Sequence, residues 1–306
     1  MQILYANSLS EGENVATLQK QLTQKIDKTK QLYFVYLQYL IQVCEYVILD
    51  ASKRANKFIP TEEDKNVNKD LADNLVLKLL TNSDELKEIQ KHFKIKSFID
   101  AGLVKKLFNE LKTKEKYVKY CKLEKKEKRD EVDILRYILR RIIGTNELLD
   151  EALAEHFINI DDDHFLCLQS LQKIIKSFGK TDDKEFLKSI LLEREETEEI
   201  TFAKELINNY ISKEKELNSI IEIRLKNWDM DRVSVVDIIL LKMAISEFLY
   251  FPYIPLKVSI NEYIDISKEY STEKSKDFIN GILDKTMKDL KSEGKIKKLG
   301  RGLINN

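Results

Sequence analysis

The sequence predicts an all-α protein, and three observations support this. Residues that break helices are scarce, with 8 glycines and 3 prolines in 306 residues. Strong helix formers, mainly Lys, Glu and Leu, are frequent, and charged residues make up 34% of the chain. Apolar residues also recur at helical spacing over most of its length. Because 43% of the residues are hydrophobic, the chain can form a sizeable core and is not expected to be disordered.

The length allows one large domain or two ordinary ones. We predict the boundary at an acidic run, residues 193–199. It separates an N-terminal helical region from a C-terminal helical domain, which is followed by a basic tail that we expect to be flexible. These three parts span residues 1–195, 196–294 and 295–306.

Charge and cysteine content limit the function classes. The formal net charge is zero, which removes the simplest argument for nucleic-acid binding, a strongly basic domain, and leaves only local basic patches. Cys44, Cys121 and Cys167 are far apart in the sequence and form no CxxC pair. This spacing predicts unpaired thiols in a reducing, cytoplasmic compartment.

Residues 32–49 form the one apolar stretch long enough to be considered as a membrane span. Gln38, Gln42 and Glu45 fall on one face of a helix there, which favours a mostly buried helix of a soluble protein. The N-terminus has no basic segment followed by an apolar run. We therefore predict neither a signal peptide nor a membrane partner.

Residues 112–129 are strongly basic, with Tyr117 and Tyr120 interleaved. One interpretation is a face that tracks phosphates, with the tyrosines stacking on bases. The other, which we favour, is a solvated helix whose lysines pair with Glu115, Glu124 and other acids at helical spacing.

The sequence shows no catalytic motif. It has no Gly-rich nucleotide loop, no HExxH and no GxSxG. The acidic cluster at 161–163, with His156 and His164 nearby, matches no standard metal-ligand spacing, and acids at a helix start favour the helix dipole instead. We predict that the protein is not an enzyme and uses no cofactor or metal.

The most informative stretch is residues 231–291, which hold three helical patterns separated by two short breaks. The first pattern, 233–251, is almost continuously apolar, and the second starts after Pro255. The third starts after Ser271 or Thr272, which we expect as its N-cap. We interpret the rest of the chain as helical scaffold around this block.

Gly281 stands in the middle of the third helix, where a glycine costs about 1 kcal/mol relative to alanine. Either a neighbouring helix passes close to it, which we favour, or a ligand approaches the backbone there. Asn280 beside it would need a partner in a core, such as Asn261. Phe278 has the helical spacing of a core residue, and a surface role is the alternative.

Two segments at a characteristic separation carry a family resemblance: Lys257-Val258-Ser259-Ile260-Asn261-Glu262 and Phe278-Ile279-Asn280-Gly281-Ile282-Leu283-Asp284. Supporting residues are Phe202, Ala203, Lys204, Glu205, Leu206, Asn227, Trp228, Val236, Asp237, Leu241, Lys242, Ala244, Glu247, Ile254 and Pro255. Together they resemble the NusB family of transcription antitermination factors. A weaker match lies at residues 2–5, and residues 20–195 look like an inserted or lineage-specific helical region.

The resemblance implies a NusB-like helical bundle with a large additional helical region. It also implies binding of the boxA element of nascent RNA together with a small-subunit ribosomal protein, NusE. The complex would help the RNA polymerase elongation complex to resist termination in ribosomal RNA operons. The RNA-binding residues it implies are Gln2, Tyr5, Lys274, Phe278, Asn280, Lys285 and Lys288, with the tail lysines as further phosphate contacts. The residues it implies for the protein partner are Glu247, Lys257, Asn261 and Glu262.

Two departures from the family pattern keep an alternative open. The arginine-rich segment that family members usually carry before the match at 2–5 is absent, as if the sequence starts in mid-helix. Lys274 and Asp277 stand where the family often has an acid and a base, so the charge is rearranged. The alternative is a helical protein–protein adaptor without RNA specificity of its own.

Overall fold

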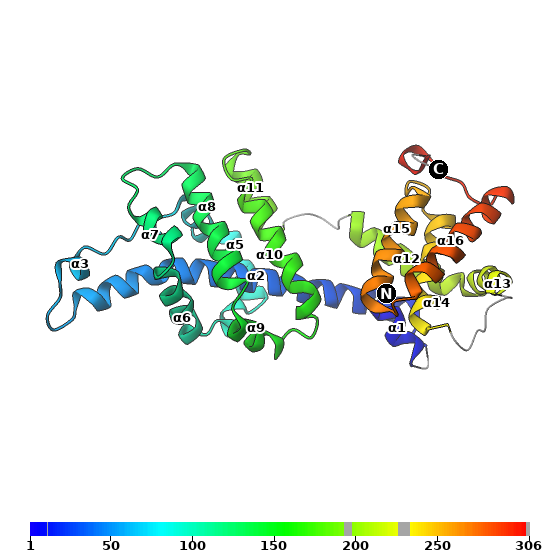
Figure 1. Cartoon of the computed structure of the whole chain (residues 1–306), viewed down its shortest axis with the longest axis horizontal. Helices are drawn as coiled ribbons and strands as arrows, with labels where there is room; N and C mark the ends of the chain where they lie inside the picture. The colour runs from blue at the N-terminus through cyan, green and yellow to red at the C-terminus, as the bar shows by residue number, and fades with distance from the viewer. Residues whose placement is uncertain (11, 193–197, 226–232, 304–306) are drawn as a thin grey trace. The chain divides into compact units, whose positions relative to one another are not determined.

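The computed structural model describes residues 1–10, 12–192, 198–225 and 233–303 (Figure 1). Every regular element in these ranges is a helix, which confirms the all-α prediction. Most of the acidic run at 193–199 and the pair Asn227 and Trp228 lie outside the described residues.

The chain forms two compact units. Unit 1 comprises residues 1–24 and 196–306, and unit 2 comprises residues 25–195. The sequence-based division groups all of 1–195 together, and the structure differs at the N-terminus. The reason is that Ile3, Leu4 and Leu18 pack into the same hydrophobic core as the C-terminal helices.

Unit 2 is built around α2 (Val15–Ala55), whose first turns belong to unit 1. Leu32, Leu40 and Val47 along this helix are buried in the main core of unit 2. The other elements of the unit are α3 (Glu62–Lys65), α4 (Leu75–Thr81), α5 (Asp84–His92), η1 (Ile95–Phe98), α6 (Ala101–Lys112), α7 (Glu115–Cys121), α8 (Lys128–Ile138), η2 (Leu139–Ile143), α9 (Glu147–Ala154), α10 (Ile160–Ile175) and α11 (Asp183–Ile190).

Helix α2 is the one described helix that is long and apolar enough to cross a membrane. Its most apolar window is 72% buried inside the protein. This agrees with the prediction that residues 32–49 form a mostly buried core helix.

The basic run at 112–129 does not offer tyrosines for stacking. Tyr117 and Tyr120 are only 7% and 3% exposed because their rings belong to the core of unit 2. Lys119 pairs with Glu115 at 2.6 Å, and Lys126 pairs with Asp70. The base-stacking interpretation of these tyrosines is therefore wrong, and a solvated face with paired charges describes the segment.

Unit 1 is a helical bundle around α14 (Val235–Tyr250), which is buried on nearly all sides, as expected of a helix that is apolar all round. It contacts five other helices of the unit. These are α1 (Gln2–Ser8), α12 (Glu198–Ser212), α13 (Glu214–Leu225), α15 (Leu256–Tyr270) and α16 (Ser275–Ser292). Figure 1 shows α14, α15 and α16 running alternately up and down.

A buried hydroxyl network fixes the start of α16. Asp237, on α14, accepts hydrogen bonds from Ser271 Oγ at 2.6 Å and Ser275 Oγ at 2.9 Å. Thr272 Oγ1 lies 2.8 Å from Ser275 Oγ. Because these hydroxyls serve the network, neither Ser271 nor Thr272 is the N-cap, and the helix begins at Ser275 after Lys274.

The segment after α16 is docked, whereas the sequence predicts a flexible tail. Lys298 is 8% exposed, and its ammonium donates to the carbonyl oxygens of Glu247 at 3.1 Å and Phe251 at 2.8 Å. It thereby satisfies carbonyl groups at the C-terminal end of α14. Burial lowers the pKa of Lys298 to about 8. Residues 300–303 close the segment with a short 3₁₀ turn, η4.

Candidate functional site

Helix α16 exposes one continuous stripe. Lys274, Phe278, Gly281, Lys285 and Lys288 follow one another at spacings of four, three, four and three residues, so they lie on one side of the helix. The three lysines and Gly281 are exposed, and Phe278 is half-buried. We call these five residues the α16 stripe.

Gly281 faces open space. A Cβ added at this position would meet nothing within 4 Å. The prediction that a neighbouring helix packs closely against Gly281 is therefore wrong. The alternative, an approach of a ligand to the helix backbone, is compatible with the structure.

Phe278 combines the two roles considered for it. Its side chain packs against the core of unit 1, yet it remains partly exposed on the stripe. A ring held in this way has one part fixed by its neighbours and another part available for stacking.

Asn280 is exposed, so it forms no buried bridge to Asn261, which is also exposed. Asn280 lies beside the stripe, on the side of the helix where Asp277 and Asp284 project. Lys288 pairs with Asp284 at 2.6 Å, which partly neutralises the C-terminal end of the stripe.

The charge of the chain is concentrated in this region. Residues 274–303 contain nine Lys and Arg residues against four Asp and Glu residues, a formal charge of +5 in a chain whose total is zero. The net neutrality of the whole sequence therefore conceals a local cationic segment.

The N-terminal candidates lie on α1, which packs on α14. Tyr5 is 38% exposed, and Gln2 is half-buried. Helix α1, which carries Gln2 and Tyr5, and helix α16, which carries the stripe, thus both pack on α14 in unit 1.

Glu247 does not lie on the surface, which corrects its assignment to a partner-binding face. It is 5% exposed and accepts hydrogen bonds from Ser259 Oγ and from Tyr263 OH, the latter at 3.1 Å. Burial raises the pKa of this carboxyl group, and the two hydrogen bonds oppose the shift. Glu247 joins α14 to α15 inside the bundle.

Lys257, Asn261 and Glu262 are exposed on α15. Lys257 and Asn261 are one turn apart and share a side of the helix, whereas Glu262 is turned about 100° from Asn261. Helix α15 packs beside α16. The structure therefore offers these three side chains to a partner next to the helix that carries the stripe.

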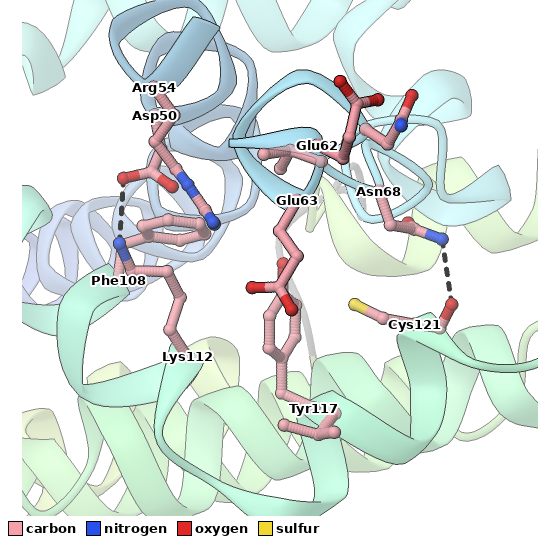
Figure 2. Close-up of a pocket in the computed structure, with 12 residues that line it drawn as sticks. Asp50, Arg54, Glu62, Glu63, Asn68, Phe108, Lys112, Tyr117 and Cys121 are labelled. Carbon is pink, nitrogen blue, oxygen red and sulfur yellow. Dashed lines mark hydrogen bonds and ion pairs between the residues drawn. The ribbon is translucent and has the colours of Figure 1, made fainter. Parts of the chain in front are cut away.

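A pocket of about 640 Å³ lies elsewhere, in unit 2, among α2, α3, α6 and α7 (Figure 2). On one side Asp50 pairs with Lys112 at 2.8 Å, and on the other Asn68 Nδ2 donates to the carbonyl oxygen of Cys121 at 2.9 Å (Figure 2). No motif in the sequence marks this pocket, because its lining comes from four helices and from residues 66–68 after α3.

Unit 1 is thus an all-helical domain that displays a basic, phenylalanine-containing helix face. Residues 166–288 match the model of the NusB family. This part of the chain is therefore similar to the NusB family. The match begins within α10 of unit 2, whereas the structure divides the units near residue 195.

Three curated relatives are each named "Transcription antitermination protein NusB". The protein of Chloroherpeton thalassium is 43% identical over 34% of this chain and 49% of its own length. The Salinibacter ruber protein is 42% identical over 34% of the chain and 64% of its own length. The Finegoldia magna protein is 42% identical over 29% of this chain and 66% of its own length. The chain thus spans from 49% to 66% of the length of these relatives.

A solved structure of T. maritima NusB is 31% identical. The similarity covers 40% of this chain and 87% of that one, with a TM-score of 0.30.

Proposed function

We propose that the protein is a transcription antitermination factor that acts in the cytoplasm on ribosomal RNA transcription. It binds boxA-type RNA together with the small-subunit ribosomal protein NusE, within the RNA polymerase elongation complex, and catalyses no reaction. The names of the relatives support this role. The observation that carries it is the α16 stripe, in which an open Gly281 lies between a partly exposed Phe278 and exposed lysines.

Each part of the stripe has a task in RNA binding. The exposed part of Phe278 stacks on a base, a contact worth about 1–3 kcal/mol. Lys274, Lys285 and Lys288 contact phosphates, and each contact weakens as salt rises. Gly281 has no side chain, so the sugar–phosphate backbone can approach the helix between these groups. Tyr5, Gln2 and Asn280 supply further contacts.

The ribosomal protein binds α15 through Lys257, Asn261 and Glu262. These side chains are exposed on the helix beside α16, so a protein bound there reaches RNA held on the stripe. The three carry both charge signs and an amide, which suits a polar rim of an interface.

The test is RNA binding by the full chain, with boxA-like RNA and a scrambled RNA of the same composition, at two salt concentrations, with and without NusE. We expect selective, salt-sensitive binding that tightens when NusE is added. Equal binding of both RNAs in the presence of NusE would contradict the proposal.

A protein–protein adaptor is the second candidate, favoured by the zero net charge of the whole chain. In the same experiment an adaptor would bind NusE tightly, and RNA would not change that affinity. A Lys257→Glu variant that loses NusE but keeps its RNA affinity would locate the protein contact on α15.

A further inference from the structure

The C-terminal segment, residues 296–303, is held on the bundle by three kinds of contact. The buried ammonium of Lys298 caps α14 as described. Leu299 N donates to the carbonyl oxygen of Pro252 at 2.8 Å, and Ile296 packs against the core of unit 1. We call this segment the C-terminal strap. It is anchored where α14 ends and α15 begins (Figure 1).

Two glycines allow the strap to lie this close. A Cβ at Gly302 would overlap the carbonyl oxygen of Pro252, so no other residue fits there without movement. Gly300 has φ +50°, in the left-handed region that favours glycine. Residues 298–302 therefore form a segment that packs closely against the bundle, and they are not a linker.

The outer side of the strap presents an aromatic ring beside cations. Tyr253 is 65% exposed, and a Cβ at Gly300 would lie 3.6 and 3.8 Å from two of its ring carbons, so the strap backs the ring. Lys297 and Arg301 are exposed on the same short segment. A supported aromatic ring next to basic side chains is a feature of single-stranded nucleic-acid sites.

Phe278 lies in the first turn of α16, and the strap follows the end of that helix along the chain. The fourteen residues between Phe278 and the end of the helix at Ser292 correspond to about 21 Å along its axis. A single strand that follows this length of the helix would need about six stacked nucleotides at about 3.4 Å each. Lys285 and Lys288 of the stripe are exposed between the two ends.

We propose that the strap and Tyr253 form a second RNA subsite, which binds the single strand flanking the element held on the α16 stripe. Tyr253 stacks on a flanking base, and Arg301 and Lys297 contact its phosphates. This inference rests on the proposed RNA-binding function and adds a site to it. The neighbouring Leu299 and Leu303 are 53% and 61% exposed and would suit a protein, but the aromatic ring and the cations favour RNA.

The experiment measures affinities of the full chain for three RNAs: a boxA-like core, the core with six uridines on its 5′ side, and the core with six uridines on its 3′ side. The variants are Tyr253→Ala, Arg301→Ala and the control Lys215→Ala, which removes an exposed lysine of α13. We expect one flank to tighten binding by the wild type about fivefold or more. Tyr253→Ala and Arg301→Ala should both lose that gain and bind the core RNA normally, and the control should keep it.

The failure of this inference differs from that of the proposed function. If the core binds selectively but neither flank adds affinity, the subsite is absent while the antitermination role stands. If the variants keep the gain from the flank, the strap does not bind RNA and the inference is wrong. If the core RNA does not bind at all, both proposals are wrong. Circular dichroism of each variant excludes misfolding as the cause.

Discussion

Ser275, the first residue of α16, donates a hydrogen bond of 2.9 Å to the buried carboxylate of Asp237 in the first turn of α14. The carboxylate also lies near the N-termini of both helices, where negative charge is favoured. This bond connects the central helix of unit 1 to the turn that carries Lys274 and precedes Phe278. The position of the α16 stripe therefore depends on a residue about forty positions earlier in the chain.

Replacing Asp237 by alanine should destabilise unit 1 and weaken RNA binding. The change removes the carboxylate that accepts hydrogen bonds from Ser271 and Ser275, and a hydrogen bond to a charged group is worth about 1.5–3 kcal/mol. Urea unfolding followed by circular dichroism measures the change in stability.

Asp265→Ala is the matched control for Asp237→Ala. Asp265 is exposed on α15 and pairs with the exposed Lys268 at 2.6 Å, so its loss should change stability by less than about 0.5 kcal/mol. Equal losses in the two variants would show that the buried network does not hold α16.

Phe278→Ala should affect both stability and RNA affinity. A fully buried phenylalanine costs about 3–5 kcal/mol when truncated, so a half-buried one should cost roughly half of that. The loss of stacking should weaken RNA binding by about 1–3 kcal/mol. Phe202→Ala is the control, since Phe202 is also half-buried in unit 1 but packs on Phe251 at 4.9 Å between ring centres. RNA binding that weakens equally in both variants would argue against a stacking role.

Gly281 allows stability and binding to be changed in opposite directions. Because a Cβ there meets nothing within 4 Å, Gly281→Ala should stabilise α16 by about 1 kcal/mol. A larger side chain, as in Gly281→Leu, should also keep the fold but block RNA from the helix backbone. A melting curve and an RNA titration of both variants test this. If Gly281→Leu binds RNA like the wild type, the backbone at this position is not approached.

Local patterns in the sequence are sufficient to predict several helices of unit 1. The apolar run at 233–251 predicts α14 because few residues interrupt it, and Ser234 caps the helix by accepting from the backbone of Asp237 at 3.0 Å. The break at Pro255 predicts the start of α15 at Leu256. The exposure of the stripe could not be predicted, because Phe278 and Gly281 suit a core and a surface equally well.

The strap could not be predicted for a different reason. Lysines and glycines are typical of mobile ends, and only the structure shows that Lys298 meets two carbonyl groups at the end of α14. The placement of Ile3 and Leu4 in the core of unit 1 is similarly non-local, since their partners lie some two hundred residues later. The burial of Glu247 is likewise non-local, because it depends on Ser259 and Tyr263 of the next helix.

Unit 2 should show a pH-dependent stability that comes from His164. This residue lies 3.1 Å from Asp150 and 2.7 Å from the hydroxyl of Tyr36, and the bond to Asp150 raises its pKa. A raised pKa in the folded state means that the protonated histidine stabilises unit 2. The contribution is complete below the unfolded pKa of about 6.5 and is lost as the pH rises through the folded pKa.

The difference between wild type and His164→Gln isolates this effect from other titrating groups. Burial raises the pKa of Asp163 and Glu131 in the same unit, so the wild-type profile alone would mix several contributions. Thermal melts followed by circular dichroism at pH values from about 5.5 to about 8.5 supply the comparison. The variant should be less stable than the wild type at the acidic end, and the gap should narrow as the pH rises. A gap that is constant over this range would mean that His164 does not titrate there and acts only by packing and hydrogen bonding.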